Sequence, residues 1–285
     1  MMRPLILFTM MVQGADVPWS DPEGAFVIRS AATYSVKLNT DATRSFRLDG
    51  HCRVEQNDKG MVLLSNHIDG VAAQQKDGSS NLQKGNATGD VDLTVDSAKA
   101  AQFNKTPPDP AKGTSRMELT SQAISMDTDG ASQAVTLPDP FKATEHRTSI
   151  GKADGAPFTE DMDATASSGK LFYLPAIGKT PAQLQTGEFQ GPVHIHIVNT
   201  SSPSGKPLVT SEYDVTGDHL TFDFTKTPGQ VVITGNVHYV TTGAMAGTGK
   251  ADTVTISTDA GFNPIEVDAH GQPAESNLHF PGAGH

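Results

Sequence analysis

Two histidines separated by one residue, His194 and His196, are the clearest candidates for metal chemistry in this sequence. On a β-strand, side chains two positions apart point to the same face, so the two imidazoles would form a two-point ligand set for zinc. His238, on a related strand, offers a third imidazole. The alternation of polar and apolar residues around the pair is more typical of a solvent-facing strand surface, and we therefore predict no metal site.

Two groups of carboxylates have residue types that suit calcium, namely Asp127 with Asp129 and Glu160 with Asp161 and Asp163. Neither group has the full twelve-residue loop with the terminal glutamate that completes the calcium site of an EF-hand. We interpret both groups as turns or solvated charge.

The remaining chemical signals argue against catalysis and against nucleic acid. The sequence has no Gly-x-Ser-x-Gly element, and its only cysteine, Cys52, lacks a local catalytic signature. The formal net charge of -11 repels the phosphates of a nucleic acid. We predict a protein that is not an enzyme, needs no cofactor and does not bind nucleic acid.

The segments around the candidate metal ligands, such as the one that contains His194 and His196, alternate between apolar and polar side chains, as strands do. Leu220, Phe222 and Phe224 are interleaved with polar residues, so their side chains share one face of a sheet. Residues 91–95 and 193–197 follow the same pattern. Because 27 glycines and 18 prolines supply frequent turns between such segments, the sequence predicts an all-β protein.

A short motif, glycine followed by one or two residues and then a β-branched or apolar run, occurs around Gly50, Gly89, Gly191 and Gly235. The spacing fits a repeated unit of about 40 residues. Glycine inside a strand usually marks a bulge or kink that curves the sheet. Repeated kinks would fold a long antiparallel meander over itself, as one continuous or one duplicated architecture.

The N-terminus has the plan of a secretory signal peptide over residues 1–15, with Arg3, an apolar run, and the small residues Gly14 and Ala15. The apolar run is shorter than the roughly 20 residues that cross a bilayer as a helix. The alternative is a buried N-terminal strand. We expect an exported protein.

The segment 213–273 resembles the OstA-like family, which includes the lipopolysaccharide-transport proteins LptA and LptC and the N-terminal domain of LptD. The resemblance is carried by the Gly-Asn-Val turn at residues 235–237 and by Ala251 and Asp252 at the start of a following strand. It implies an open V-shaped jelly roll (a β-taco) in the periplasm, whose apolar interior carries the acyl chains of lipopolysaccharide or a related lipid.

Apolar side chains of the alternating strands are the candidates for the lipid-binding lining of such an interior. They are Val193, Ile195, Leu220, Phe222, Phe224, Val231, Ile233, Val237, Tyr239, Val254 and Ile256. An open sheet also presents unpaired edge strands, so we expect head-to-tail strand addition to copies of this chain or to other transport components.

The predicted organisation is a signal peptide at 1–15, an N-terminal OstA-like β region at 16–150, a C-terminal one at 151–275 and a flexible tail at 276–285. Two alternatives to lipid binding stay open. One is a structural or adhesive envelope protein of β-repeats with a packed core. The other is an envelope hydrolase or sugar-binding jelly roll, which would need converging carboxylates or histidines in a pocket.

Overall fold

The computed structural model describes residues 19–20, 24–41, 43–74, 80–106, 113–129, 132–150, 157–174, 183–201, 208–243, 246–258, 264–271 and 275–279. The predicted signal peptide, residues 1–15, lies outside these ranges.

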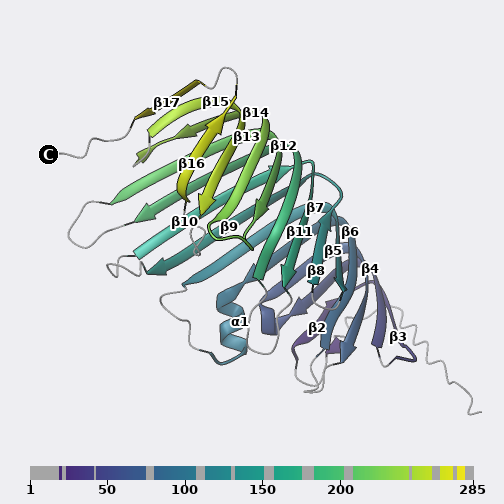
Figure 1. Ribbon diagram of the computed structural model, residues 1–285. Helices are drawn as coiled ribbons and strands as arrows, with labels where there is room; N and C mark the ends of the chain where they lie inside the picture. Colours follow the sequence, from purple (N-terminus) through teal and green to yellow (C-terminus); the bar gives the residue numbers. More distant parts are fainter. Residues whose placement is uncertain are drawn as a thin grey trace, which may run out of the picture.

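The described chain is all-β, as predicted, with one antiparallel sheet, a short helix α1 (Ser97–Phe103) and a 3-10 turn η1 (Asn57–Lys59). The strands stack side by side along the long axis of the molecule (Figure 1). In chain order they are β1 (Trp19–Ser20), β2 (Phe26–Ser30), β3 (Thr33–Leu38), β4 (Thr43–Gln56), β5 (Met61–Gln74), β6 (Ser80–Asp96), β7 (Thr114–Asp129), β8 (Ser132–Leu137), β9 (Phe141–Ile150), β10 (Pro157–Ala166), β11 (Ser168–Leu174), β12 (Gln183–Ser201), β13 (Val209–Asp223), β14 (Gly229–Thr241), β15 (Ala246–Thr258), β16 (Pro264–His270) and β17 (Glu275–His279).

The sheet folds over itself because its long strands bend near their middle and contribute one half to each of two facing layers. The short strands show the division, since β8 pairs with the second half of β7 and β9 pairs with the first half. Layer A contains β3, β8, β11 and β16, and layer B contains β2, β9, β10 and β17. β4, β5, β6, β7, β12, β13, β14 and β15 run through both layers.

The bends lie at the glycines that the sequence motif singled out. Gly50, Gly89 and Gly235 have φ values of +79°, +77° and +74°, and each is followed by a second left-handed residue. Each of these pairs interrupts the strand register as a bulge, which confirms the predicted kinks. Glycine suits this position because a side chain disfavours positive φ. At Gly191 the register also shifts, between Gln190 and Val193.

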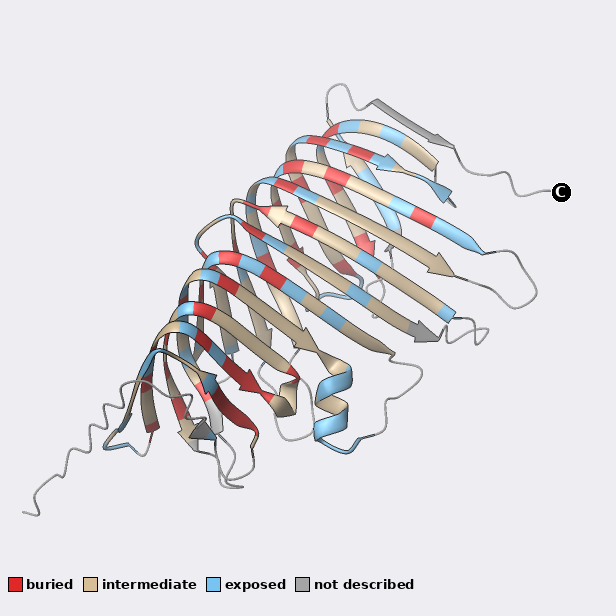
Figure 2. Cartoon of the chain, turned by 180° about the vertical axis from the view of Figure 1, so that it is seen from behind, coloured by how far each residue is buried: buried red, intermediate tan, exposed pale blue. Residues whose placement is uncertain are grey.

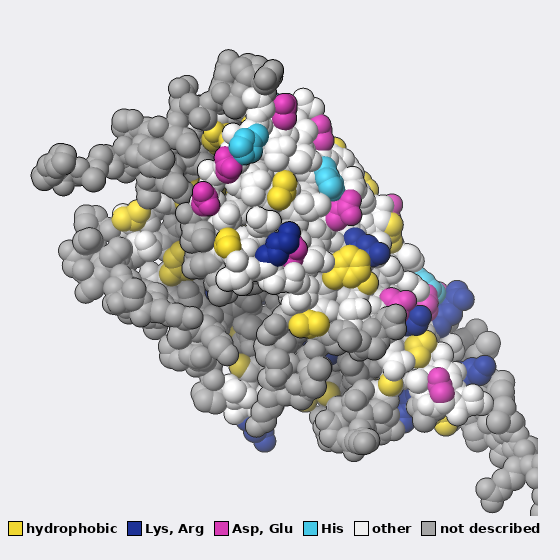
Figure 3. Space-filling view, viewed as in Figure 1, with side chains coloured by type: hydrophobic (Ala, Val, Ile, Leu, Met, Phe, Trp, Pro, Cys, Tyr) yellow, Lys and Arg dark blue, Asp and Glu magenta, His cyan; other side chains and the backbone are white. Residues whose placement is uncertain are grey.

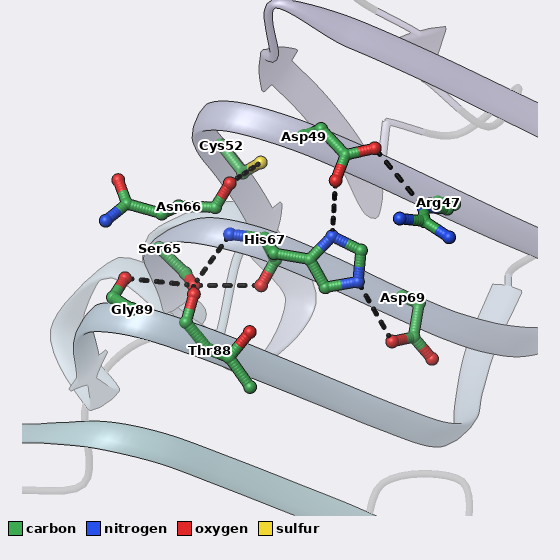
Figure 4. A network of polar contacts seen from close by, with 9 residues as sticks. All are labelled: Arg47, Asp49, Cys52, Ser65, Asn66, His67, Asp69, Thr88 and Gly89. Carbon is green, nitrogen blue, oxygen red and sulfur yellow. Dashed lines mark hydrogen bonds and ion pairs between the residues drawn. The ribbon is translucent and has the colours of Figure 1, made fainter.

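Buried polar groups satisfy the backbone at one of these bends (Figure 4). The hydroxyl of Ser65, a buried residue, donates to the carbonyl oxygen of Thr88 at 2.7 Å and lies 2.9 Å from that of His67. The thiol of Cys52 donates to the carbonyl oxygen of Asn66 at 3.6 Å. A bulge leaves backbone carbonyl oxygens without their hydrogen-bond donors on the neighbouring strand. At this bend, the hydroxyl of Ser65 and the thiol of Cys52 supply the missing donors.

One hydrophobic core runs between the layers, with members from β2 at one end of the sheet to β15 near the other. Along the strands, buried positions alternate with less buried ones (Figure 2).

The predicted boundary at residue 150 falls between β9 and β10, which pair from Phe141↔Ala166 to Ile150↔Pro157. Within the predicted tail, residues 276–279 belong to β17, which pairs with β15, and residues 280–285 lie outside the described ranges.

An ion-pair cluster links β2 to β4 at the N-terminal end of the sheet. The Glu55 carboxylate, on a side chain only 10% exposed, accepts hydrogen bonds from Arg29 Nε at 2.9 Å and Arg53 Nε at 2.8 Å. Burial by itself raises the pKa of Glu55, but the two arginine hydrogen bonds outweigh it and hold the pKa below its ordinary value.

We expect Glu55→Gln to lower the free energy of unfolding at pH 7 by about 1 kcal/mol, since both arginines are about half exposed and the solvent screens them. A lowered folded-state pKa stabilises the protein above the unfolded pKa, and this contribution is lost as the pH falls through the folded value. The difference between wild type and variant in urea unfolding should therefore shrink on acidification. Glu118→Gln, at an exposed pair with Arg116, is the control, and an equal loss there would contradict the argument.

Candidate functional site between the two layers

The predicted lining residues all face the interior between the layers. Most are buried, namely Val193, Leu220, Phe222, Ile233, Val237, Tyr239 and Val254. The other four, Ile195, Phe224, Val231 and Ile256, are partly buried and pack against the same core. Alternation along each strand, together with the antiparallel register, places them on one face.

Along β13 and β14 in layer A, the interior side chains are covered less completely as the distance from the bends increases. On β13, Leu220 next to the bend is 1% exposed, Phe222 is 7% exposed, and Phe224 just beyond the strand is only partly buried. On β14, Ile233 next to the bend is 2% exposed and Val231 is partly buried. On these two strands the interior side chains are therefore more fully covered next to the bends than away from them. We call the partly buried interior positions, represented by Ile195, Phe224, Val231 and Ile256, the mouth.

A row of aromatic rings runs from the bends toward the mouth. The ring centroids of Phe141 and Phe189 are 5.2 Å apart, those of Phe189 and Phe222 are 6.0 Å apart, and those of Phe222 and Phe224 are 5.0 Å apart. Phe141 lies in layer B and the other three lie in layer A, so the row connects the layers. Gly187, opposite Phe222 on β12, leaves room for this ring, because a Cβ there would lie 2.2 Å from the ring edge.

The three histidines considered as metal ligands lie on the outer face of layer B, and two of them contact a carboxylate. His194 Nε2 lies 2.9 Å from Asp214 Oδ2, and His196 Nδ1 lies 3.3 Å from the same oxygen. His238 is exposed on β14. Within the ranges that the structure describes, no group of three His, Cys, Asp or Glu side chains is arranged to hold a metal ion.

His67 and His146 also contact carboxylates on neighbouring strands. His67 Nδ1 lies 2.6 Å from Asp49 (Figure 4). His146 Nδ1 lies 2.6 Å from Asp161. The hydrogen bond from His67 lowers the pKa of Asp49. On the face shown in Figure 3, charged and histidine side chains are spread out, with hydrophobic ones scattered among them.

A shallow depression of about 360 Å³ on the outside of layer A is lined by residues that include Phe172, Glu188 and Lys226.

The prediction of turns for the carboxylate groups is wrong, because both groups lie in strands, whereas the predicted solvated charge holds for the half-exposed side chains of Asp127, Asp161 and Asp163. Asp127 and Asp129 belong to β7, and Glu160, Asp161 and Asp163 belong to β10. Alternation along β10 turns Glu160 to the interior, in line with Met162, and turns the two aspartates to the outer face. The three carboxylates therefore do not converge.

Glu160 belongs to a polar set in the mouth that our sequence reasoning missed. Arg147 of β9 is directly opposite Glu160, and Glu145, two residues before Arg147, also faces the interior. Asn199 of β12 is opposite Glu160 on its other side. The alternation of Glu160 with Met162 and Ala164 was the signal that would have placed Glu160 on the interior face.

Burial changes the acidity of these groups. It raises the pKa of Glu145 and of Glu160, and the positive charge of Arg147 offsets this only in part. Glu145 raises the pKa of Glu160 further. In layer A, burial raises the pKa of Tyr173 to about 12, with a further contribution from Glu145, which places this tyrosine near the polar set.

Burial also raises the pKa of the Cys52 thiol, to about 11, so the thiol is protonated at neutral pH and is a poor nucleophile.

No protein-family model, curated protein or solved structure gave a significant match to this chain. In the described part of the chain, the structure contains no helix that is long and apolar enough to cross a membrane.

Proposed function

We propose that this chain is a periplasmic protein that binds an acylated lipid, lipopolysaccharide or a related lipid, between the two layers and takes part in its transport to the outer membrane. The observation that carries the proposal is the apolar mouth, where Ile195, Phe224, Val231 and Ile256 are only partly covered by the rest of the protein. A lipid chain placed against these side chains would complete their burial. The resemblance of residues 213–273 to the OstA-like family supports the same function.

Acyl chains can be held here without charge attraction. Each methylene group removed from water contributes about 0.8 kcal/mol, so a few methylenes outweigh a screened surface repulsion. A protein with a formal net charge of -11 can therefore bind an anionic lipid by its chains. In this proposal the protein is a carrier and not an enzyme, which agrees with the inert Cys52 thiol.

The alternative is a structural or adhesive protein whose interior is simply packed. Packing at the bends suits either function, because Leu220 and Val237 are at most 1% exposed there. The partly uncovered apolar residues of the mouth favour lipid binding, because a bound acyl chain would complete their burial. In a transport role, strand addition at the ends of the sheet would link copies of the chain or link it to other components.

Native mass spectrometry of the purified protein, followed by lipid extraction, tests the proposal. We expect a co-purified acylated lipid, and we expect fluorescent lipopolysaccharide and fluorescent phospholipid to bind with saturation. If no lipid co-purifies and neither probe binds, the interior is a packed core and the structural alternative replaces lipid transport.

A further inference from the structure

The mouth is not apolar along its whole length. In the middle of layer B, the interior positions far from the bends carry Arg147 on β9, Glu160 on β10 and Asn199 on β12, side by side in register. Glu145 is one interior position closer to the bends on β9 and faces Met162 of β10. These four residues, here called the polar belt, are each partly buried.

The polar belt presents hydrogen-bond acceptors whose needs the protein does not fully meet. The Oδ1 atom of Asn199 is buried and has no hydrogen-bond partner. An unpaired buried acceptor is costly, and such an atom usually indicates a donor that binds there. Glu145 and Glu160 add two carboxylates, and burial penalises their charged forms despite Arg147. Asn199, with its unpaired amide oxygen, thus lies in register beside Glu160, whose charged form burial penalises, and Arg147 is the one cation of the belt.

A primary ammonium group suits this arrangement, because it carries three N–H donors and a positive charge. Arg147, which lies between the glutamates in the belt, offers a guanidinium to a phosphate. We propose that the polar belt binds the head group of a zwitterionic lipid, with the amine at Glu145, Glu160 and Asn199 and the phosphate at Arg147. The inference rests on the proposed function, because the acyl chains of the same lipid would lie in the apolar mouth.

The test uses three phospholipids with identical dioctanoyl chains and different head groups, titrated calorimetrically below their micellar concentrations. Phosphatidylethanolamine has a primary amine, phosphatidylcholine has a quaternary amine without N–H donors, and phosphatidylglycerol has no amine. We expect phosphatidylethanolamine to bind the wild-type protein about tenfold more tightly than either of the others, since only its head group combines N–H donors with a positive charge, whereas the hydroxyls of phosphatidylglycerol are neutral donors. Soluble glycerophosphoethanolamine should compete with it, which separates head-group recognition from chain binding.

The Glu145→Gln, Glu160→Gln double variant should bind phosphatidylethanolamine only as well as wild type binds phosphatidylglycerol, with binding of phosphatidylglycerol itself unchanged. Glu188→Gln, on the outer face, is the matched control and should keep the wild-type preference. If wild-type protein binds all three lipids equally, the head-group inference is overturned and the proposed function stands. If it binds none of them, the head-group inference fails, and the proposed function is then decided by the co-purification of lipid and by the lipopolysaccharide probe. Both of these outcomes are measured on wild-type protein. They therefore overturn the inference even if the double variant fails to fold.

Discussion

Replacing Phe222 with alanine should lower the free energy of unfolding by about 3–5 kcal/mol. Phe222 is 7% exposed, contacts the rings of Phe189 and Phe224, and fills the space that Gly187 leaves on the neighbouring strand. The small residue opposite cannot close the resulting cavity, because glycine has no side chain to move into it. The unfolding midpoint in urea, measured at constant m-value, reports this loss directly.

Phe224→Ala is the matched control, because it removes the same group nearer to the mouth, where the ring is only partly buried. We expect a loss of about 1–2 kcal/mol, since less apolar area returns to water and solvent can fill the gap. Equal losses at the two positions would contradict the difference in burial between the two rings.

Replacing Val231 with aspartate should weaken the binding of a diacyl lipid by at least about tenfold. Val231 lies in the mouth, and a hydrated carboxylate there would keep about two chain methylenes in water, which corresponds to about 1.6 kcal/mol. The effect on folding should be smaller, because the position is only partly buried. Fluorescent phospholipid titration measures the affinity, and thermal unfolding measures the stability.

The next residue on the same strand supplies the control. Val232 points to the outer face of layer A, where it lines the shallow depression. Val232→Asp introduces the same charge into the same strand without touching the interior, so lipid affinity should stay within about twofold of wild type. A comparable loss of affinity in both variants would point to a general charge effect and would remove the mouth as the binding surface.

Much of the fold could be predicted from local sequence patterns, because two physical rules decide it. Alternation with a period of two assigns each side chain to one face, which is why Leu220 and Phe222 were placed together correctly. The preference of glycine for positive φ marks the bends at Gly50, Gly89 and Gly235. Both rules act over a few residues and need no knowledge of distant contacts.

The polar belt could not be found in the same way, because it depends on which strands become neighbours. Glu160 and Asn199 are far apart in the sequence and meet only because β10 pairs with the second half of β12. Reading Glu160 together with Asp161 as an acidic group ignored the alternation that sends them to opposite faces. Partial burial of the apolar mouth likewise depends on packing between strands that are far apart in the sequence, which no short pattern encodes.

The bends have a consequence for how proteins of this shape can change in length. Because successive strands bend at corresponding points, a hairpin inserted anywhere along the sheet can continue both layers without disturbing the core on either side. Chain direction reverses at every strand, so insertions or deletions must come in pairs of strands if the flanking segments are to keep their orientation. The length of the interior can therefore grow by duplication of hairpins, whereas its cross-section stays the same.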